Sequence, residues 1–382
     1  MRTAIVSDLH LGSGFGEDLL RIAAIRRTLR EEIAGADRLV LLGDVLELRE
    51  LPLPHVLESA RPFFEELGQV MAGRPVTLVP GNHDHRLAEP MLDRLALAGE
   101  TLELECRGDP AGEPLTRIAA WLGEARLELA YPGVWLREDV YATHGHYMDC
   151  HMNLPRMECV AAAAMTRTLR PLPSHPTPED YEKVLRPVYE LTYGLAQGGV
   201  AQRASRPSER AWKTLANRNG DRRSRIRRAA LRAAIPLGIR GMNRLLHAEF
   251  ESDFSAEAIS QSGIAAATEL TRRLDLQAAH VLTGHTHRAG PWESEVEWSL
   301  PGGGRLHNTG SWIFATAFHH PGTPPSAYWP GTVTWLGDDG PPQRRRLLLE
   351  RPHEELRAAV DGQRAVTGRP PADAESLRAN RR

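Results

Sequence analysis

The sequence predicts an α/β fold with a parallel sheet, and three observations support this prediction. Apolar runs alternate with amphipathic helical patterns in the order strand 3–7, helix 17–33, strand 39–42, helix 55–72 and strand 76–79. Such a βαβαβ order requires right-handed crossovers between parallel strands. Five apolar runs lead into Asp, Asn or His, either directly or after one or two residues. The carboxyl ends of strands are where α/β sheets assemble their sites. An apolar content of 41% and a charged content of 25% are ordinary for a globular protein.

The later elements are expected in two groups. Residues 126–143 have the pattern of hairpin strands that turn at Pro132-Gly133, which suggests a second, mixed sheet. Ser255 can cap a helix that runs to about residue 274. The strands expected after this helix span residues 278–283 and a closing hairpin of residues 332–336 and 344–350.

The chain divides into a core, an insert and a tail. Residues 1–150 and 276–350 carry the strand patterns and form the predicted core. Residues 151–275 are mainly helical, with repeated Pro breaks, and predict an insert or lid whose last helix rejoins the core. Residues 351–382 are rich in Arg, Ala and Pro, and the end of this tail is expected to be disordered.

Composition also limits the class of protein. The three cysteines (Cys106, Cys150 and Cys159) include no Cys-x-x-Cys pair, which predicts a reducing, cytoplasmic setting. No apolar run reaches the roughly 18 residues needed to span a membrane. Because the first strand follows Met1-Arg2 directly, no signal peptide is expected.

The polar residues at the strand ends have the chemistry of metal ligands. Asp8-x-His10 and His285-x-His287 each place two ligand types two residues apart, and alternate residues of an extended segment point the same way. Carboxylate, imidazole and amide ligands without a thiolate suit Mn²⁺, Fe or Zn²⁺. Seven ligands are too many for one ion and suit two ions that share one ligand. The candidates are Asp8, His10, Asp44, Asn82, His144, His285 and His287.

This set of motifs resembles the calcineurin-like metallophosphoesterases. The motifs that carry the resemblance occur in family order within residues 1–150 and 278–336: Asp8-x-His10, Gly43-Asp44, Gly81-Asn82-His83-Asp84, His144 and Gly284-His285-x-His287. The resemblance implies a four-layer α/β/β/α metallophosphoesterase sandwich, here with a helical insertion. It also implies a dinuclear phosphohydrolase that cleaves a phosphodiester or pyrophosphate bond by metal-activated water, with Mn²⁺ as the expected metal and Fe or Zn²⁺ as alternatives.

The resemblance also implies individual roles. The first metal would be held by Asp8, His10 and His287, the second by Asn82, His144 and His285, with Asp44 bridging both. His83 would contact the phosphoryl group and protonate the leaving oxygen. Glu47 replaces the last Asp of the family's Gly-Asp-x-x-Asp motif and is a candidate to orient His83. Asp84 could also help, although an Asp after a turn is more often a backbone cap. His146 and Asp149 are expected either to contact a metal ligand or the substrate, or to have a partly exposed structural role, and the two alternatives are equally expected.

Departures from the family pattern narrow the branch. Protein Ser/Thr phosphatases continue the Gly-Asp-x-x-Asp motif with Arg-Gly, whereas this chain has Leu48-Arg49, which argues against that class. The stretches Ser7–Gly12 and Gly284–Arg288 are more similar to the UDP-diacylglucosamine hydrolases. The common members of that branch have Arg where this chain has His83.

Two alternatives stay open. A nuclease of the same fold is less expected, because the basic residues lie in one helical segment rather than along a groove with interleaved aromatic residues. A non-catalytic interaction scaffold is disfavoured by the complete set of ligands and by His83.

The expected partner is an anionic, phosphate-containing substrate. The basic segment 203–244 carries thirteen Lys or Arg against Glu209 and Asp221, in a chain whose net charge is −2. This segment is either a solvated helix face, a lid that guides substrate, or a contact with an anionic membrane. The expected location is therefore cytoplasmic, with a peripheral membrane position as the alternative.

Overall fold

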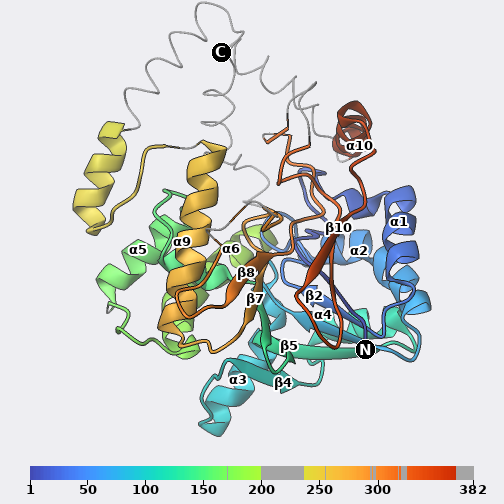
Figure 1. Cartoon of the computed structure of the whole chain (residues 1–382), viewed down its shortest axis with the longest axis horizontal. Helices are drawn as coiled ribbons and strands as arrows, with labels where there is room; N and C mark the ends of the chain where they lie inside the picture. The colour runs from blue at the N-terminus through green and yellow to red at the C-terminus, as the bar shows by residue number, and fades with distance from the viewer. Residues whose placement is uncertain are drawn as a thin grey trace, which may run out of the picture.

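A curled sheet with helices on its outer sides forms the frame of the protein (Figure 1). The computed structural model describes residues 1–169, 171–198, 236–253, 255–292, 295, 298–316, 318–319 and 325–366. The strands are β1 (Thr3–Val6), β2 (Arg38–Leu42), β3 (Pro75–Val79), β4 (Glu105–Gly108), β5 (Arg126–Arg137), β6 (Val140–Thr143), β7 (His280–Thr283), β8 (Arg305–Asn308), β9 (Thr332–Leu336) and β10 (Gln343–Arg346). Among the described residues their order is β10-β9-β1-β2-β3-β5-β6-β7-β8, with β4 paired to β5.

The first half of the sheet has the predicted βαβαβ order. β1 pairs in parallel with β2, and β2 with β3, through helices α1 (Ala23–Ile33) and α2 (Leu53–Val70). The predicted start of the first helix at residue 17 is wrong, because a short 3-10 turn, η1 (Leu19–Arg21), precedes it and the backbone at Ile22 is extended. β9 and β10 extend this half as the predicted antiparallel hairpin.

β5 joins the two halves of the sheet. Its first part pairs in parallel with β3, and its last part pairs antiparallel with β6. The predicted turn at Pro132-Gly133 is therefore wrong, since both residues lie inside β5 and the chain turns between β5 and β6 instead. Proline is tolerated there because β5 changes partners at this point, so the missing N–H interrupts no central ladder. β6, β7 and β8 complete the expected second, mixed sheet in parallel.

Alternate side chains of each strand pack into different apolar clusters, and these clusters define the layers. Val6 and Leu41 face an outer cluster under the helices of the first half, whereas Ile5 and Val40 face an inner cluster. The inner cluster lies between the two halves of the sheet, because Ala142 and Leu282 of the second half also belong to it. A second outer cluster lies under the helices of the other half. This order of helices, sheet, sheet and helices confirms the predicted α/β/β/α sandwich.

The helices of the two outer layers come from different parts of the chain (Figure 1). Over the first half lie α1, α2, α3 (Glu89–Ala98), α4 (Glu113–Leu122) and α10 (His353–Val366). Over the second half lie α5 (Met157–Thr168), α6 (Pro178–Gln197) and α9 (Ala256–Arg273). The predicted cap of α9 is present, since the Ser255 hydroxyl accepts a hydrogen bond from Ala258 N. None of the described helices is long and apolar enough to cross a membrane.

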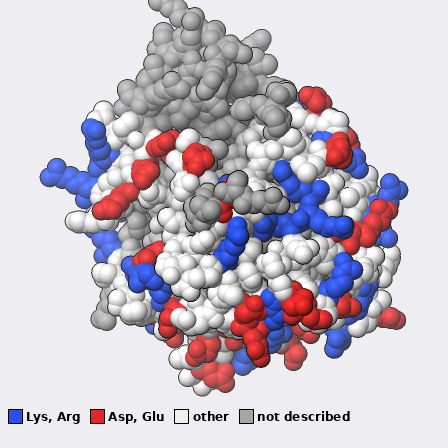
Figure 2. Space-filling model, in the orientation of Figure 1, with Lys and Arg blue, Asp and Glu red and all other residues white. Residues whose placement is uncertain are grey.

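The basic segment 203–244 lies almost entirely outside the described residues. Its last part belongs to a helix over residues 236–246. On the face shown in Figure 2, the basic and acidic side chains of the described residues are interspersed. Lys and Arg side chains gather to the right of its centre, with Asp and Glu side chains mostly around them.

Gly68 of α2 provides a test of the packing between α2 and α4. A Cβ at this position would lie 2.3 Å from the Leu122 carbonyl oxygen. The carbonyl is part of the backbone of α4, and the added Cβ would be fixed to the backbone of α2, so neither can rotate away. Gly68→Ala should therefore reduce the free energy of unfolding by about 1–3 kcal/mol. Gly194 of α6 is the matched control, because a Cβ there would meet nothing within 4 Å. Gly194→Ala should raise the free energy of unfolding by about 0.5–1 kcal/mol. If urea unfolding showed that both variants change this free energy in the same direction, the packing described here would be contradicted.

Candidate metal centre

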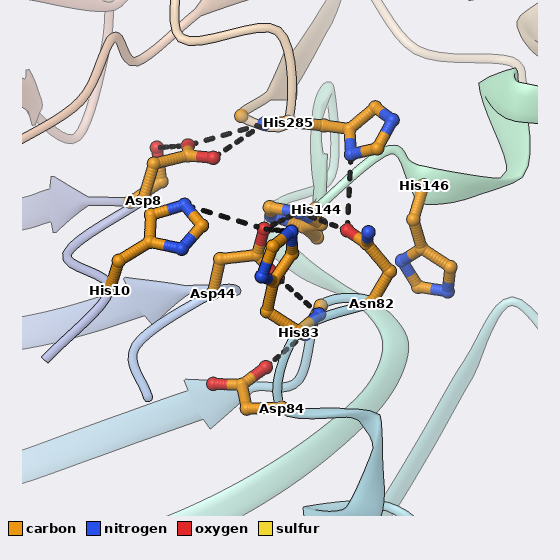
Figure 3. A network of polar contacts seen from close by, with 12 residues as sticks. Asp8, His10, Asp44, Asn82, His83, Asp84, His144, His146 and His285 are labelled. Atoms are coloured by element: carbon orange, nitrogen blue, oxygen red, sulfur yellow. Dashed lines mark hydrogen bonds and ion pairs between the residues drawn. The ribbon is translucent and has the colours of Figure 1, made fainter. Parts of the chain in front are cut away.

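Polar side chains from both halves of the sheet meet at the carboxyl ends of five strands (Figure 3). Potential ligand atoms of Asp8, His10, Asp44 and His287 lie within 4.8 Å of one another, as do those of Asp44, His144 and His285. Asn82 joins the second set through its contacts with the two imidazoles. The structure thus brings all seven predicted ligand residues to one edge of the sandwich.

The first set combines residues after β1, β2 and β7. His287 Nε2 lies 3.1 Å from Asp8 Oδ1 and 3.2 Å from His10 Nε2. Asp44 Oδ2 is 3.7 Å from His10 Nε2. The Ser7 hydroxyl donates to Asp8 Oδ2 at 2.5 Å, which fixes the orientation of this carboxylate.

The second set is oriented by hydrogen bonds on the far side of each imidazole. His144 Nδ1–H donates to the Leu42 carbonyl at 3.1 Å, and His285 Nε2–H donates to Asp149 Oδ1 at 2.9 Å. The other nitrogen of each ring therefore faces Asn82 Oδ1, at 3.3 Å for His144 and 3.2 Å for His285. Imidazoles that bind metals are commonly held in this way by a carboxylate or carbonyl. Asp149 is only 1% exposed, so of the two alternatives left open for it the partly exposed one is wrong.

The backbone at the candidate ligands is unusual. Five of them have left-handed φ angles: Asp8 (53°), His10 (45°), Asp44 (49°), His285 (67°) and His287 (61°). Non-glycine residues adopt this region rarely, and such residues cluster at functional sites. The chain therefore turns sharply within a few residues of each strand end.

Two glycines explain why the ligand loops can pack so closely. Gly43 has φ +80°, and a Cβ on it would lie 2.3 Å from the His144 ring. A Cβ on Gly81 would lie 2.4 Å from Asp44 Oδ1. Any side chain at these positions would displace a candidate ligand, which gives the Gly-Asp and Gly-Asn pairs of the sequence a steric reason.

His83 lies beside the two ligand sets and is paired with Glu47. Glu47 Oε2 accepts from His83 Nδ1–H at 2.7 Å and from His10 Nδ1–H at 2.9 Å. Burial opposes the charged form of His83, but the carboxylates of Glu47 and Asp44 outweigh it and raise the pKa of this imidazole. His83 Nε2 points toward the centre, 3.9 Å from Asp44 Oδ2, and its side chain is 18% exposed. Of the three residues predicted to be catalytic, the structure thus places His83 and Glu47 together.

Asp84 contacts the backbone of the neighbouring loops. Its Oδ1 accepts from Gly81 N at 2.7 Å, and its Oδ2 accepts from Val45 N at 2.8 Å and Leu46 N at 3.2 Å. Burial and the nearby Asp44 charge raise the pKa of Asp84 to about 6. In this position the carboxylate ties the loop after β3 to the loop after β2.

Next to the centre lies a buried polar cluster that the sequence did not predict. Glu182 of α6 pairs with His85 Nε2 at 2.9 Å and accepts from the hydroxyls of Tyr147, at 2.6 Å, and Tyr131. His85 pairs through its other nitrogen with Glu89 at 3.1 Å. In the sequence, an acid within the apolar face of α6 was the available signal.

His146 connects this cluster to the candidate ligands. Its Nε2 is 3.1 Å from the Tyr131 hydroxyl, and its ring lies 5.8 Å from that of His144. Burial, together with the nearby imidazole of His144, holds the pKa of His146 well below its usual value. His146 is 1% exposed, so the partly exposed alternative is wrong for this residue too.

The donor set fits divalent metal ions. It consists of imidazole nitrogens, carboxylate oxygens and one amide, which suits Mn²⁺, Fe or Zn²⁺. Asn82 is 2% exposed, and its Nδ2 has no partner among the described residues. Burial opposes the charge on His144, but Asp44 outweighs it and raises the pKa of that imidazole to about 10. The buried carboxylates of the centre therefore stabilise a positively charged group that lies between them.

Comparison with known families agrees with this chemistry. The model of the calcineurin-like phosphoesterases matches residues 1–190, about half of the chain, from β1 into α6. Comparison with curated proteins gives no match. The chain belongs to the calcineurin-like phosphoesterase family, whose members are metal-dependent hydrolases of phosphoesters.

The cluster around His85 makes stability depend on pH. Burial opposes the charge on His85, but Glu182 and Glu89 outweigh it and raise the pKa to about 9 from 6.5. Because the folded pKa is the higher one, the charged ring stabilises the fold fully below pH 6.5, and this contribution is lost as pH rises through about 9. The destabilisation caused by His85→Gln should therefore shrink by about 3 kcal/mol between about pH 6 and pH 9.5.

Urea unfolding at a series of pH values measures this difference. His55→Gln on α2 is the control, because His55 is exposed. Its effect on the free energy of unfolding should be small at every pH. A destabilisation by His85→Gln that is constant with pH would show that the ring is not charged in the fold.

Proposed function

We propose that this member of the calcineurin-like phosphoesterase family is a dinuclear phosphohydrolase that cleaves a phosphodiester or pyrophosphate bond. The position of Asp44 carries the proposal. Its Oδ2 lies 3.2 Å from His144 Nε2 and 3.7 Å from His10 Nε2, so one carboxylate faces both ligand sets. Two ions that share a ligand are the usual clamp for in-line attack on phosphorus.

Each ion has its own residues in this proposal. One ion would be held by Asp8, His10 and His287 and the other by Asn82, His144 and His285, with Asp44 shared. When bound, the two ions lower the pKa of the attacking water and neutralise charge on the phosphoryl oxygens. Mn²⁺ is the proposed metal, with Fe and Zn²⁺ as the alternatives.

His83 is the proposed general acid. Glu47 accepts from its Nδ1–H, so its Nε2–H is directed toward the centre. The two nearby carboxylates raise the pKa of the imidazole, which favours the protonated form that the leaving oxygen needs. Asp84 takes a supporting role, since its oxygens bind the backbone of the two loops.

An anionic substrate of moderate size suits this site. The basic residues of the sequence are concentrated in segment 203–244 rather than spread along a groove with interleaved aromatic residues, which does not favour a nucleic acid. The sequence after Glu47 lacks the Arg-Gly of the protein phosphatases.

The roles of Asp44 and His83 can be separated by metal analysis. Asp44→Asn should lose bound metal and activity together, because both ions depend on this carboxylate. His83→Ala should keep its metals and lose about a hundredfold in kcat, as expected for a general acid. Asp338→Asn, at a carboxylate that is 79% exposed, should change neither property. Loss of metal in His83→Ala but not in Asp44→Asn would reverse the assignment.

The substrate class can be tested with model compounds. With added Mn²⁺, the protein should hydrolyse the aryl diester bis-p-nitrophenyl phosphate, because the proposed centre attacks phosphodiesters. Phosphopeptides should be poorer substrates by kcat/KM, because Leu48-Arg49 stands where protein phosphatases have Arg-Gly. A strong preference for phosphopeptides would overturn the proposed class.

A further inference from the structure

Arg49 lies next to the candidate centre without belonging to its ligands. Its backbone N–H donates to Glu47 Oε1 at 3.1 Å, so it directly adjoins the carboxylate that orients His83. Its guanidinium donates through Nη2 to Glu158 Oε1 of α5 at 2.6 Å. The side chains of Arg49 and Glu158 are 8% and 12% exposed, which places the pair at the margin of the buried site.

The pair leaves one strong donor without a partner. Arg49 Nη1 is buried and makes no hydrogen bond to any described residue. A planar guanidinium that only neutralises a carboxylate can use two parallel N–H donors, whereas here Glu158 takes Nη2 alone. Buried polar groups are nearly always satisfied, so this guanidinium N–H is available to a ligand.

Charged groups of both signs surround the Arg49 guanidinium. Arg156, the N-cap residue of α5, interacts electrostatically with both Glu158 and Arg49. Burial opposes the charge on Arg49, but the carboxylates of Glu158, Glu47 and Asp44 outweigh it and raise the pKa of this guanidinium, so it stays charged beside the centre. The Arg49 charge also acts on His83, the residue proposed to face the leaving oxygen. The guanidinium therefore lies close enough to the centre for its unpaired donor to meet an anion bound there.

We propose that Arg49 binds an anionic oxygen of the substrate phosphate and that Glu158 holds its guanidinium in position for this contact. This inference rests on the proposed phosphohydrolase function and adds a substrate-binding residue to it. Arg49 supplies a fixed positive charge and a directed N–H donor, both of which match a phosphate oxygen. Glu158 makes α5 a support of the substrate site.

The competing explanation is a structural ion pair that ties α5 to the loop after β2. Breaking such a pair destabilises the fold from either side, so Arg49→Gln and Glu158→Gln would then have the same effects on every property. The two explanations differ in what remains after Glu158→Gln. That variant keeps the guanidinium and frees it, whereas Arg49→Gln removes the charge that a phosphate would meet.

Binding of inorganic phosphate to the Mn²⁺-loaded protein separates the two explanations. By isothermal titration calorimetry, Arg49→Gln should weaken phosphate binding by about tenfold or more, the loss expected for one charge-assisted hydrogen bond. Glu158→Gln should weaken phosphate binding by only about threefold, because the guanidinium remains but loses the carboxylate that positions it. The KM for bis-p-nitrophenyl phosphate should follow the same order, while thermal unfolding should be lowered similarly in both variants. Equal phosphate binding by the two variants would overturn the inference.

Two further measurements keep this test independent of folding and of the proposed function. Arg49→Lys keeps the charge but lacks the planar fork, so it should bind phosphate with intermediate affinity, and parent-like affinity would contradict a directed contact. Metal content should equal that of the parent in all three variants. If the parent protein failed to hydrolyse the diester, the proposed function would be wrong. A hydrolytically active parent whose Arg49→Gln and Glu158→Gln variants bind phosphate equally would leave that function intact and remove only the role of Arg49.

Discussion

The Asp44 carboxylate sets the constraint on which the rest of the structure depends. It is 1% exposed, and a buried charge is tolerated only when it is paired and hydrogen-bonded. His83 N donates to its Oδ1 at 2.8 Å, and the imidazole of His144 contacts its Oδ2. Burial raises the pKa of Asp44, but the imidazoles of His144, His83 and His10 outweigh this effect and hold the pKa well below its usual value. Three loops from different strands must therefore meet around one oxygen pair, and the glycines at 43 and 81 leave the room for it.

The same groups also hold the two halves of the sheet together at their edge. The Asp8 carboxylate, after β1, accepts from the backbone N–H of His285, after β7, at 3.1 and 3.2 Å. The Asp8 carbonyl accepts from Trp312 N at 3.0 Å. Away from this edge the halves are joined through β5 and through the inner apolar cluster. The candidate centre is therefore part of the contact between the halves, and replacing a ligand removes support from the fold as well as chemistry.

Local patterns were sufficient for much of this structure. The βαβαβ order and the candidate ligands at five strand ends could be predicted from apolar runs that stop at polar residues. Each of these signals is contained in a few consecutive residues. The continuous path of β5 was not predictable, since Pro132-Gly133 is a turn signal unless the strand changes partners there. The contacts of Asp149 with His285 and of Glu182 with His85 were also missed. Each joins residues more than 90 positions apart, and only the packed fold shows that these acids are buried.

Buried acids on α5 and α6 link the assembly of the site to the docking of these helices. Glu182 reaches His85, directly after the Gly81–Asp84 motif, and Glu158 reaches Arg49, two residues after Glu47. A buried carboxylate without its cation costs several kcal/mol, and the same holds for the cation without its carboxylate. Neither α5 nor α6 can therefore separate from the sheet without leaving a charge unpaired beside His83 or Asn82. Helices that contribute no predicted ligand thus hold the loops of the candidate centre in place from outside. They do so through His85 and Arg49, which lie one residue after Asp84 and two residues after Glu47 in the sequence.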